Sequence, residues 1–444
     1  MKTQTSRKGW GSRIGFILAT SGAAVGLGNI QRFPYIAAES GGAVFVLLYL
    51  LCVLVLGLPL IFVEFSLGRH THKNPVCAIE AIRPNSRWKY VGFLSIATAF
   101  FILTYYSVIA GWTIGYFVKM LRGEELDLNA FTSNAPVVLS YMAIFMLSVI
   151  YIVKKGVKKG IERYSKILMP MLLLLLIGLI IRSLTLPNSG AGMRFYLEPD
   201  FSEINGRVFI NALSQAFFSL CIGEAVLITY GSYTSKEDNL ISSGCYIALF
   251  DTLIAILSGL IIFPALFAFG YTPGEAGVGL SFVVLPKIFA AMPFGNIFGA
   301  SFFLLLGFAA LTTSIALLEM PVAYLVDSKK CSRSVAVWAV GIAAFILSIP
   351  AALSKGASPF LSTMEFLGNR GFYDIMDFVW GNMGMVFGGL LLAIFTGWVW
   401  GTKNAAKELR QGCKHFTWQS TVWGVIVRYV APIVILAILA SFFI

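Results

Sequence analysis

Residues 10–34 constrain the fold most, because this stretch is long and apolar enough to cross a bilayer and yet is interrupted at its centre. Its middle holds residues that a lipid-facing helix avoids, namely Gly22, Gly26, Gly28, Asn29 and Arg32. Lipid offers no partner for free backbone groups or for a guanidinium, so a broken helix is tolerated only where protein walls a cavity. The interruption therefore predicts a binding site near the bilayer midplane, made of free carbonyls and half-helix ends.

The composition excludes an ordinary soluble domain, since 58% of the 444 residues are hydrophobic and only 12% are charged. Apolar runs of membrane-spanning length recur along the whole chain. We expect a single transmembrane domain over residues 1–444, embedded in a lipid bilayer. Eleven spans are predicted, at residues 12–37, 41–69, 88–120, 136–153, 164–186, 207–233, 239–270, 296–327, 333–354, 374–402 and 417–443.

The net charge of +12 could suit nucleic-acid binding, but its placement argues against that partner. With the N-terminus in the cytoplasm and the C-terminus outside, the cytoplasmic segments hold most of the 33 Lys and Arg residues. This distribution predicts a multi-pass protein of the plasma (inner) membrane. The three histidines show no metal-ligand spacing and no catalytic set is found, so an enzyme is not expected. The sequence does not indicate an oligomeric state.

The sixth span repeats the interruption of the first, because Gly223 lies among small residues and Glu224 follows it at bilayer depth. Each group of five spans thus begins with a broken one. Five is odd, so the second group runs in the opposite direction, as in an inverted repeat. The repeats are expected at about residues 10–186 and 207–402, with span eleven at 417–443. Close helix packing would explain the glycines but not the charges beside them.

Four segments resemble the neurotransmitter:sodium symporter family, in particular its bacterial amino-acid transporters with eleven spans. They are WGSRIGFILATSGAAVGLGNIQRFPY (10–35), PLIFVEFSLGR (59–69), QAFFSLCIG (215–223) and GFAALTTSIALLE (307–319). The resemblance extends over about residues 7–440. It implies an all-α polytopic membrane protein with a LeuT-type 5+5 inverted repeat, broken spans one and six, and an eleventh helix. It also implies a sodium-coupled symporter that imports an amino acid by alternating access.

The resemblance places the amino-acid substrate between the two broken spans. There, backbone N–H groups and a cation suit its carboxylate, and free carbonyls suit its ammonium. Tyr106 matches the family tyrosine that meets the carboxylate, and Phe218 matches the aromatic lid. The subsite is largely apolar, which favours a hydrophobic or aromatic amino acid. The implied substrate-binding residues are Ala23, Ala24, Gly26, Leu27, Gly28, Ile102, Tyr106, Phe218, Ser219, Cys221, Gly223, Glu224, Thr313 and Leu317.

Two sodium ions are implied by the same resemblance, and sodium prefers oxygen ligands. The first site consists of Ala24, Asn29, Ser219 and Asp251. The second consists of Gly22, Val25, Ala309, Thr312 and Thr313. The two threonine hydroxyls could instead bond back to their own helix, as is common in membranes.

Asp251 predicts that transport does not require chloride. Chloride-dependent relatives carry a neutral asparagine at this position and need a bound anion, whereas a fixed carboxylate supplies the negative charge directly. Tyr49, Gln215 and Ser219 still resemble the chloride neighbourhood. Some chloride-independent relatives have a further acid where this chain has Ala255.

Two charge pairs match the gates of the family: Arg32 with Asp377 outside, and Arg7 with Asp327 inside. A charge in lipid costs at least about 2.5–3.5 kcal/mol, so these groups need partners. Permanent structural bridges are the alternative interpretation.

Further positions match structural features of the family. Trp10 and Tyr233 are expected near the inner pair, and Glu64 is expected to brace the broken helices. Gly160 and Pro170 match a segment of span five that unwinds in the family.

Glu224 departs from the family pattern, because relatives commonly have an apolar residue there. It could accept a hydrogen bond from a tyrosine hydroxyl, an indole N–H or a basic side chain of the substrate. It could be protonated by burial and take part in proton counter-movement. It could also turn away and brace span six, and the sequence leaves these three hypotheses open.

Overall fold

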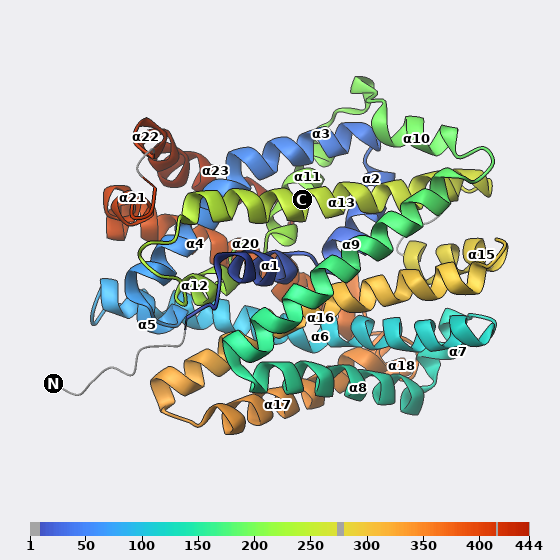
Figure 1. Ribbon diagram of the computed structural model, residues 1–444, viewed down its shortest axis with the longest axis horizontal. Helices are drawn as coiled ribbons and strands as arrows, with labels where there is room; N and C mark the ends of the chain where they lie inside the picture. The colour runs from blue at the N-terminus through green and yellow to red at the C-terminus, as the bar shows by residue number, and fades with distance from the viewer. Residues whose placement is uncertain (1–8, 273–278, 414–415, 444) are drawn as a thin grey trace.

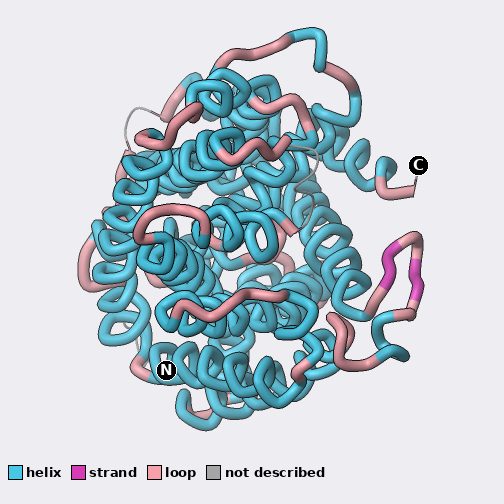
Figure 2. The backbone as a smooth tube through the Cα atoms, turned by 90° about the vertical axis from the view of Figure 1, so that its right-hand side faces the viewer, coloured by secondary structure: helices cyan, strands magenta, loops and turns pink. Residues whose placement is uncertain are grey.

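The computed structural model describes residues 9–272, 279–413 and 416–443. Most of the described chain is helical, and the axes of most long helices are roughly aligned across the molecule (Figure 1). Within the described residues the only strands are β1 (Glu365–Phe366) and β2 (Asn369–Arg370). They pair antiparallel as a small hairpin at one edge of the molecule (Figure 2). The sequence-based expectation of an all-α fold is confirmed.

Nine helical stretches of the described chain are long and apolar enough to cross a bilayer unbroken. Five are single helices: α6 (Lys89–Arg122), α8 (Ala135–Lys154), α13 (Leu240–Ala268), α16 (Gly295–Lys329) and α17 (Arg333–Leu353). The other four contain wider π-type turns. The first two are α3 (Ala43–Cys52) with η2 (Val53–Gly57) and α4 (Leu58–Thr71), and η3 (Val157–Glu162) with α9 (Arg163–Leu184). The last two are α19 (Phe372–Met376) with η6 (Asp377–Gly384), α20 (Met385–Ile394), η7 (Phe395–Gly401) and α21 (Thr402–Leu409), and α22 (Trp418–Val425) with η8 (Ile426–Val430) and α23 (Ala431–Ser441).

The first predicted span is broken, as its glycines indicated. Helix α1 (Arg13–Ala24) ends where Val25 adopts an extended conformation, and the chain resumes as η1 (Gly28–Arg32) and α2 (Phe33–Glu39). The two halves are bent by 53° relative to each other. The break leaves backbone groups around residues 25–27 outside the regular helical pattern.

The sixth predicted span is broken as well. Helix α11 (Gly206–Ser219) is separated from α12 (Val226–Gly231) by a non-helical stretch at residues 220–225. Gly223 has a φ of 91°, in the region that favours glycine, and a Cβ there would collide with the carbonyl oxygen of Met385. The bend is therefore pressed against α20, and its position in the molecule is fixed.

Shorter elements connect the spans: α5 (Pro75–Ile82), α7 (Leu128–Ser133), α10 (Gly190–Leu197), η4 (Phe201–Glu203), η5 (Leu280–Val284), α15 (Leu285–Ala290) and α18 (Pro359–Ser362). The connection between α13 and α16 contains η5 and α15. Phe282 packs edge-on against Trp112 and Tyr116 of α6, with ring centroids 5.6 and 5.1 Å apart. This connection thus covers one end of the helix core.

Candidate functional site

A small cavity of about 20 Å³ lies where the two broken spans meet. Ten of the fourteen predicted substrate residues line it: Ala24, Gly26, Gly28, Ile102, Tyr106, Phe218, Cys221, Glu224, Thr313 and Leu317. The other four, Ala23, Leu27, Ser219 and Gly223, are chain neighbours of lining residues at the same two breaks. The fold therefore brings together segments that are nearly 300 residues apart in the sequence.

Glycines keep the first break open to the cavity. A Cβ on Gly28 would lie 2.7 Å from the Phe218 ring, and one on Gly26 would lie 2.6 Å from the Tyr106 hydroxyl. The same hydroxyl accepts a hydrogen bond from the backbone N–H of Leu27 at 2.9 Å. Backbone groups at this break can thus approach a bound carboxylate closely, with a phenol oxygen beside them.

The four side chains Asn29, Tyr49, Ser219 and Asp251 form a buried polar cluster next to the cavity. The Asn29 amide nitrogen donates to Ser219 Oγ at 2.9 Å and to Asp251 Oδ1 at 2.7 Å. Ser219 Oγ donates to Asp251 Oδ2 at 2.6 Å, and the Tyr49 hydroxyl lies 3.4 Å from that oxygen. One carboxylate, one amide oxygen and hydroxyl oxygens are hard ligands of the kind that sodium prefers.

The five residues predicted for the second sodium site also come together, where α1 ends against α16. Thr313 Oγ1 donates across to the Val25 carbonyl oxygen at 3.3 Å, whereas Thr312 Oγ1 donates within its own helix to the Ala309 carbonyl at 3.0 Å. A Cβ on Gly22 would lie 3.2 Å from Thr312 Cβ, so these two segments touch. Thr312 thus bonds back to its own helix, whereas Thr313 reaches across to the first broken span.

The outer charge pair is joined through a residue that sequence reasoning did not select. Arg32 Nη2 donates to Asn382 Oδ1 at 3.2 Å. The Asn382 amide donates in turn to the Asp377 carbonyl oxygen at 3.3 Å and is 3.5 Å from its carboxylate. The Arg32 guanidinium also lies 4.3 Å from the centroid of the Phe218 ring. Arg32, Phe218 and η6 therefore form one contact layer beside the cavity.

Arg7 lies outside the described residues, so its predicted pairing with Asp327 is not described. Asp327 Oδ2 accepts a hydrogen bond from the Asn74 amide at 3.2 Å. Trp10 packs near Tyr233 with ring centroids 6.2 Å apart. Trp10 and Tyr233 are thus neighbours, and their position relative to the inner pair stays a prediction.

Two buried glutamates tie broken or unwound segments to their neighbours. Glu64 Oε1 accepts from the backbone N–H of Gly223 at 2.8 Å, which fixes the bend of the sixth span. Glu162 accepts from the Gly11 backbone N–H at 2.6 Å and from Ser12 Oγ at 3.0 Å, which holds the start of α1. Glu162 lies two residues after Gly160, within η3.

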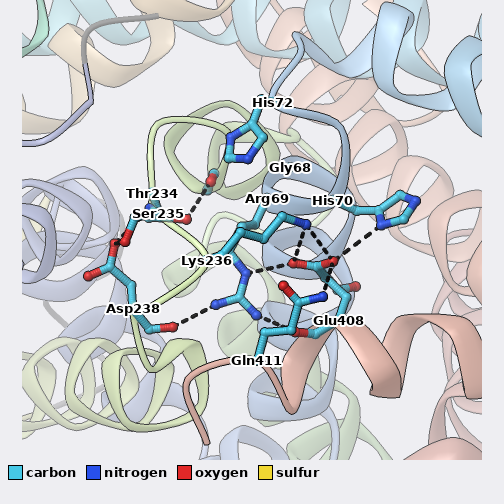
Figure 3. A network of polar contacts seen from close by, with 12 residues as sticks. Gly68, Arg69, His70, His72, Thr234, Ser235, Lys236, Asp238, Glu408 and Gln411 are labelled. Atoms are coloured by element: carbon cyan, nitrogen blue, oxygen red, sulfur yellow. Dashed lines mark hydrogen bonds and ion pairs between the residues drawn. The ribbon is translucent and has the colours of Figure 1, made fainter. Parts of the chain in front are cut away.

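A charged cluster around the buried residues Arg69 and Glu408, at the end of α4, was missed by sequence reasoning (Figure 3). Glu408 binds Arg69 Nε at 2.8 Å, Lys236 Nζ at 3.0 Å and His70 Nδ1 at 3.2 Å. Arg69 also donates to the Asp238 carbonyl at 2.6 Å. Unpaired charges at the ends of two apolar spans were the available signal, but the sequence does not show that these ends meet.

A polytopic helical chain with two spans broken around one small cavity has the architecture of a LeuT-type membrane transporter. Comparison with solved structures agrees with this class. MhsT, solved in complex with L-phenylalanine, aligns with a TM-score of 0.90 and 41% identity, covering 98% of this chain and 100% of that one.

Sequence comparison gives the family. The model of the sodium:neurotransmitter symporter family matches residues 7–128 and 125–444. A sodium-dependent transporter of Bacillus subtilis, YhdH, is 36% identical over 97% of this chain and 96% of its own length. A sodium-dependent transporter of Haemophilus influenzae is 36% identical over 98% of both chains. The chain therefore belongs to the sodium:neurotransmitter symporter family and is a sodium-dependent transporter, not an enzyme.

Proposed function

We propose that this protein couples the import of one amino acid to two sodium ions by alternating access, without a chloride requirement. The observation that carries the proposal is the contact between the cavity and the buried cluster around Asp251. Ser219 of the cluster directly follows Phe218, which lines the cavity, so a carboxylate bound in the cavity and a cation bound in the cluster would be close together. Each ligand then stabilises the site of the other.

An α-amino acid fits the polarity of the cavity walls. Its carboxylate can reach the backbone at Gly26 and the Tyr106 hydroxyl, and its side chain can extend toward Ile102, Phe218 and Leu317. These three residues are apolar and favour a hydrophobic or aromatic body. The related transporter MhsT was solved with L-phenylalanine, which supports an amino acid of this kind.

The two proposed sodium sites use oxygens of the broken spans. In the first, the Asn29 amide must turn its oxygen toward Ser219 and Asp251, because its nitrogen faces them in this structure. In the second, the carbonyls of Gly22, Val25 and Ala309 join the hydroxyls of Thr312 and Thr313. Ions held between α1 and its partner helices would favour one arrangement of these elements over the other.

The absence of a chloride requirement rests on Asp251. Its carboxylate is fully buried and lies 2.6 Å from Ser219 Oγ, so it supplies a fixed negative charge beside the first proposed sodium site. Tyr49 and Ser219, which resemble a chloride neighbourhood, instead contact this carboxylate.

The gates and the orientation complete the proposal. The contact layer of Arg32, Asn382 and Asp377 would close the cavity on the outside, and Arg7 with Asp327 would close it on the inside. The positive-inside distribution places the N-terminus in the cytoplasm and the C-terminus outside the plasma membrane. Residues 1–444 then act as one transport unit, with repeats at about 10–186 and 207–402.

Uptake into proteoliposomes tests the proposal. Purified protein is reconstituted, and uptake of a panel of labelled amino acids is measured with an inward sodium gradient, in chloride and in gluconate. We expect sodium-driven accumulation of at least one hydrophobic or aromatic amino acid, equal in both anions. Sodium flux at channel rates without any amino acid, or no accumulation of any amino acid, contradicts the proposal.

A further inference from the structure

Glu64 and Glu224 are buried acids that each leave Oε2 without a hydrogen-bond partner among the described residues, and of the two it is Glu224 that lines the cavity. Only 3% of its surface is exposed, and its Oε2 has no hydrogen-bond partner. By contrast, Asp251 accepts from Asn29 and Ser219, and Glu319 accepts from Arg333 and Tyr233. A buried carboxylate oxygen without a donor is costly, and such groups are normally paired.

The neighbourhood of Glu224 offers no basic side chain. In the described part of the chain, no ion pair involves Glu224. The closest guanidinium on the cavity's outer side, that of Arg32, is directed to Asn382 and the Phe218 ring. Glu64, the nearby acid, already accepts from the backbone N–H of Gly223. Because Glu224 lines the cavity and its Oε2 has no partner among the described residues, a molecule bound there can supply the donor that this oxygen lacks.

The backbone holds Glu224 toward the cavity. Cys221, Gly223 and Ala225 all have positive φ values, of 52°, 91° and 58°. Gly223 is pressed against α20 and hydrogen-bonded to Glu64, so the bend cannot rotate without breaking both contacts. Glu224 lines the cavity together with the apolar residues Ile102, Phe218 and Leu317. This arrangement disfavours a brace turned away from the site.

We infer that Glu224 selects amino acids whose side chain has an apolar body and ends in a hydrogen-bond donor. The donor is either neutral, as the hydroxyl of tyrosine or the indole N–H of tryptophan, or cationic, as the ammonium of lysine with its aliphatic stem. The inference rests on the proposed function, because it concerns the side-chain end of the same substrate site. It narrows the substrate class from hydrophobic or aromatic amino acids to those whose apolar side chain ends in a hydrogen-bond donor.

The test compares amino acids that differ only in the donor. Competition for sodium-driven uptake is measured for tyrosine against phenylalanine and for lysine against norleucine. A site that leaves an acceptor unpaired rejects the analogue without the donor, so at least one pair should show a preference of about tenfold or more. Preference in the first pair identifies a neutral donor, and preference in the second identifies a cationic one.

Two variants assign that preference to the carboxyl group. Glu224→Met should reduce the ratio to about one, whereas Glu224→Gln, which keeps an acceptor oxygen, should retain part of a neutral-donor preference and lose a cationic one. Asp200→Asn is the control, since it neutralises an exposed loop acid that does not line the cavity and should keep the ratio within about threefold.

The outcomes separate this inference from the proposed function. If amino acids are accumulated but both pairs compete equally in the wild type, the inference is wrong and the proposed function stands. If the wild type shows a preference that Glu224→Met and Glu224→Gln both leave unchanged, another group provides it and the inference is again wrong. If no amino acid is accumulated, the proposed function itself fails.

Discussion

Replacing Asp251 by asparagine removes one fixed charge and keeps the shape of the side chain. The position is fully buried, and its carboxylate contacts Asn29 and Ser219 at 2.7 and 2.6 Å. An asparagine there reproduces the residue of chloride-dependent relatives. We therefore expect Asp251→Asn to transport poorly without chloride and to be rescued when chloride is added.

The size of the effect follows from the distances. A cation bound by the same groups lies within about 4 Å of the carboxylate. Two unit charges at that distance attract by about 4 kcal/mol at an effective dielectric constant of about 20. Loss of this attraction corresponds to a factor of roughly 10³ in sodium affinity, which a bound anion can restore only in part.

The assay is sodium-driven uptake at several chloride concentrations, with gluconate as the replacement anion. Asp200→Asn, which removes an exposed acid from a loop, is the matched control and should remain independent of chloride. If Asp251→Asn takes up the amino acid in gluconate as fast as the wild type, with an unchanged sodium requirement, the role assigned to this carboxylate is refuted.

Three further predictions concern other parts of the structure. Glu408→Ala leaves the buried Arg69 without its carboxylate partner and should destabilise the protein by about 3–5 kcal/mol, seen as a lower midpoint of thermal unfolding in detergent. Gly28→Ala places a Cβ 2.7 Å from the Phe218 ring and should weaken substrate binding at least about tenfold. Thr313→Val removes one proposed sodium ligand and should raise the sodium concentration for half-maximal uptake about tenfold.

Each of these predictions has a distinct contradicting result. An unchanged unfolding midpoint for Glu408→Ala means that the ion pair between Arg69 and Glu408 is not needed for stability. Wild-type affinity in Gly28→Ala means that the substrate does not use this backbone. An unchanged sodium dependence in Thr313→Val, with normal folding, removes that hydroxyl from the second site.

Local chemistry made the broken spans predictable. Gly26 and Gly28 weaken a helix, and Asn29 and Arg32 do not suit lipid, so an interruption was expected where the structure shows it. The carboxylate at Glu224 marked the sixth span in the same way. The resemblance to a family then supplied the individual cavity residues, which spacing alone could not provide.

Two features could not be read from the sequence because they depend on tertiary geometry. Asn382 joins Arg32 to Asp377 because η6 is a wide turn, which brings residues five apart onto one side, whereas a regular helix pairs residues three or four apart. Glu408 meets Arg69 across 339 positions of sequence. Only the packing of α21 against α4 shows that these two charges are partners.

Equilibrium binding of a transported, labelled amino acid to purified protein, titrated with sodium, tests the central claim most directly. If the broken spans hold cation and substrate in one site, sodium should raise amino-acid affinity, and the amino acid should raise sodium affinity by the same factor. Equal amino-acid binding when sodium is replaced by potassium or choline contradicts the account.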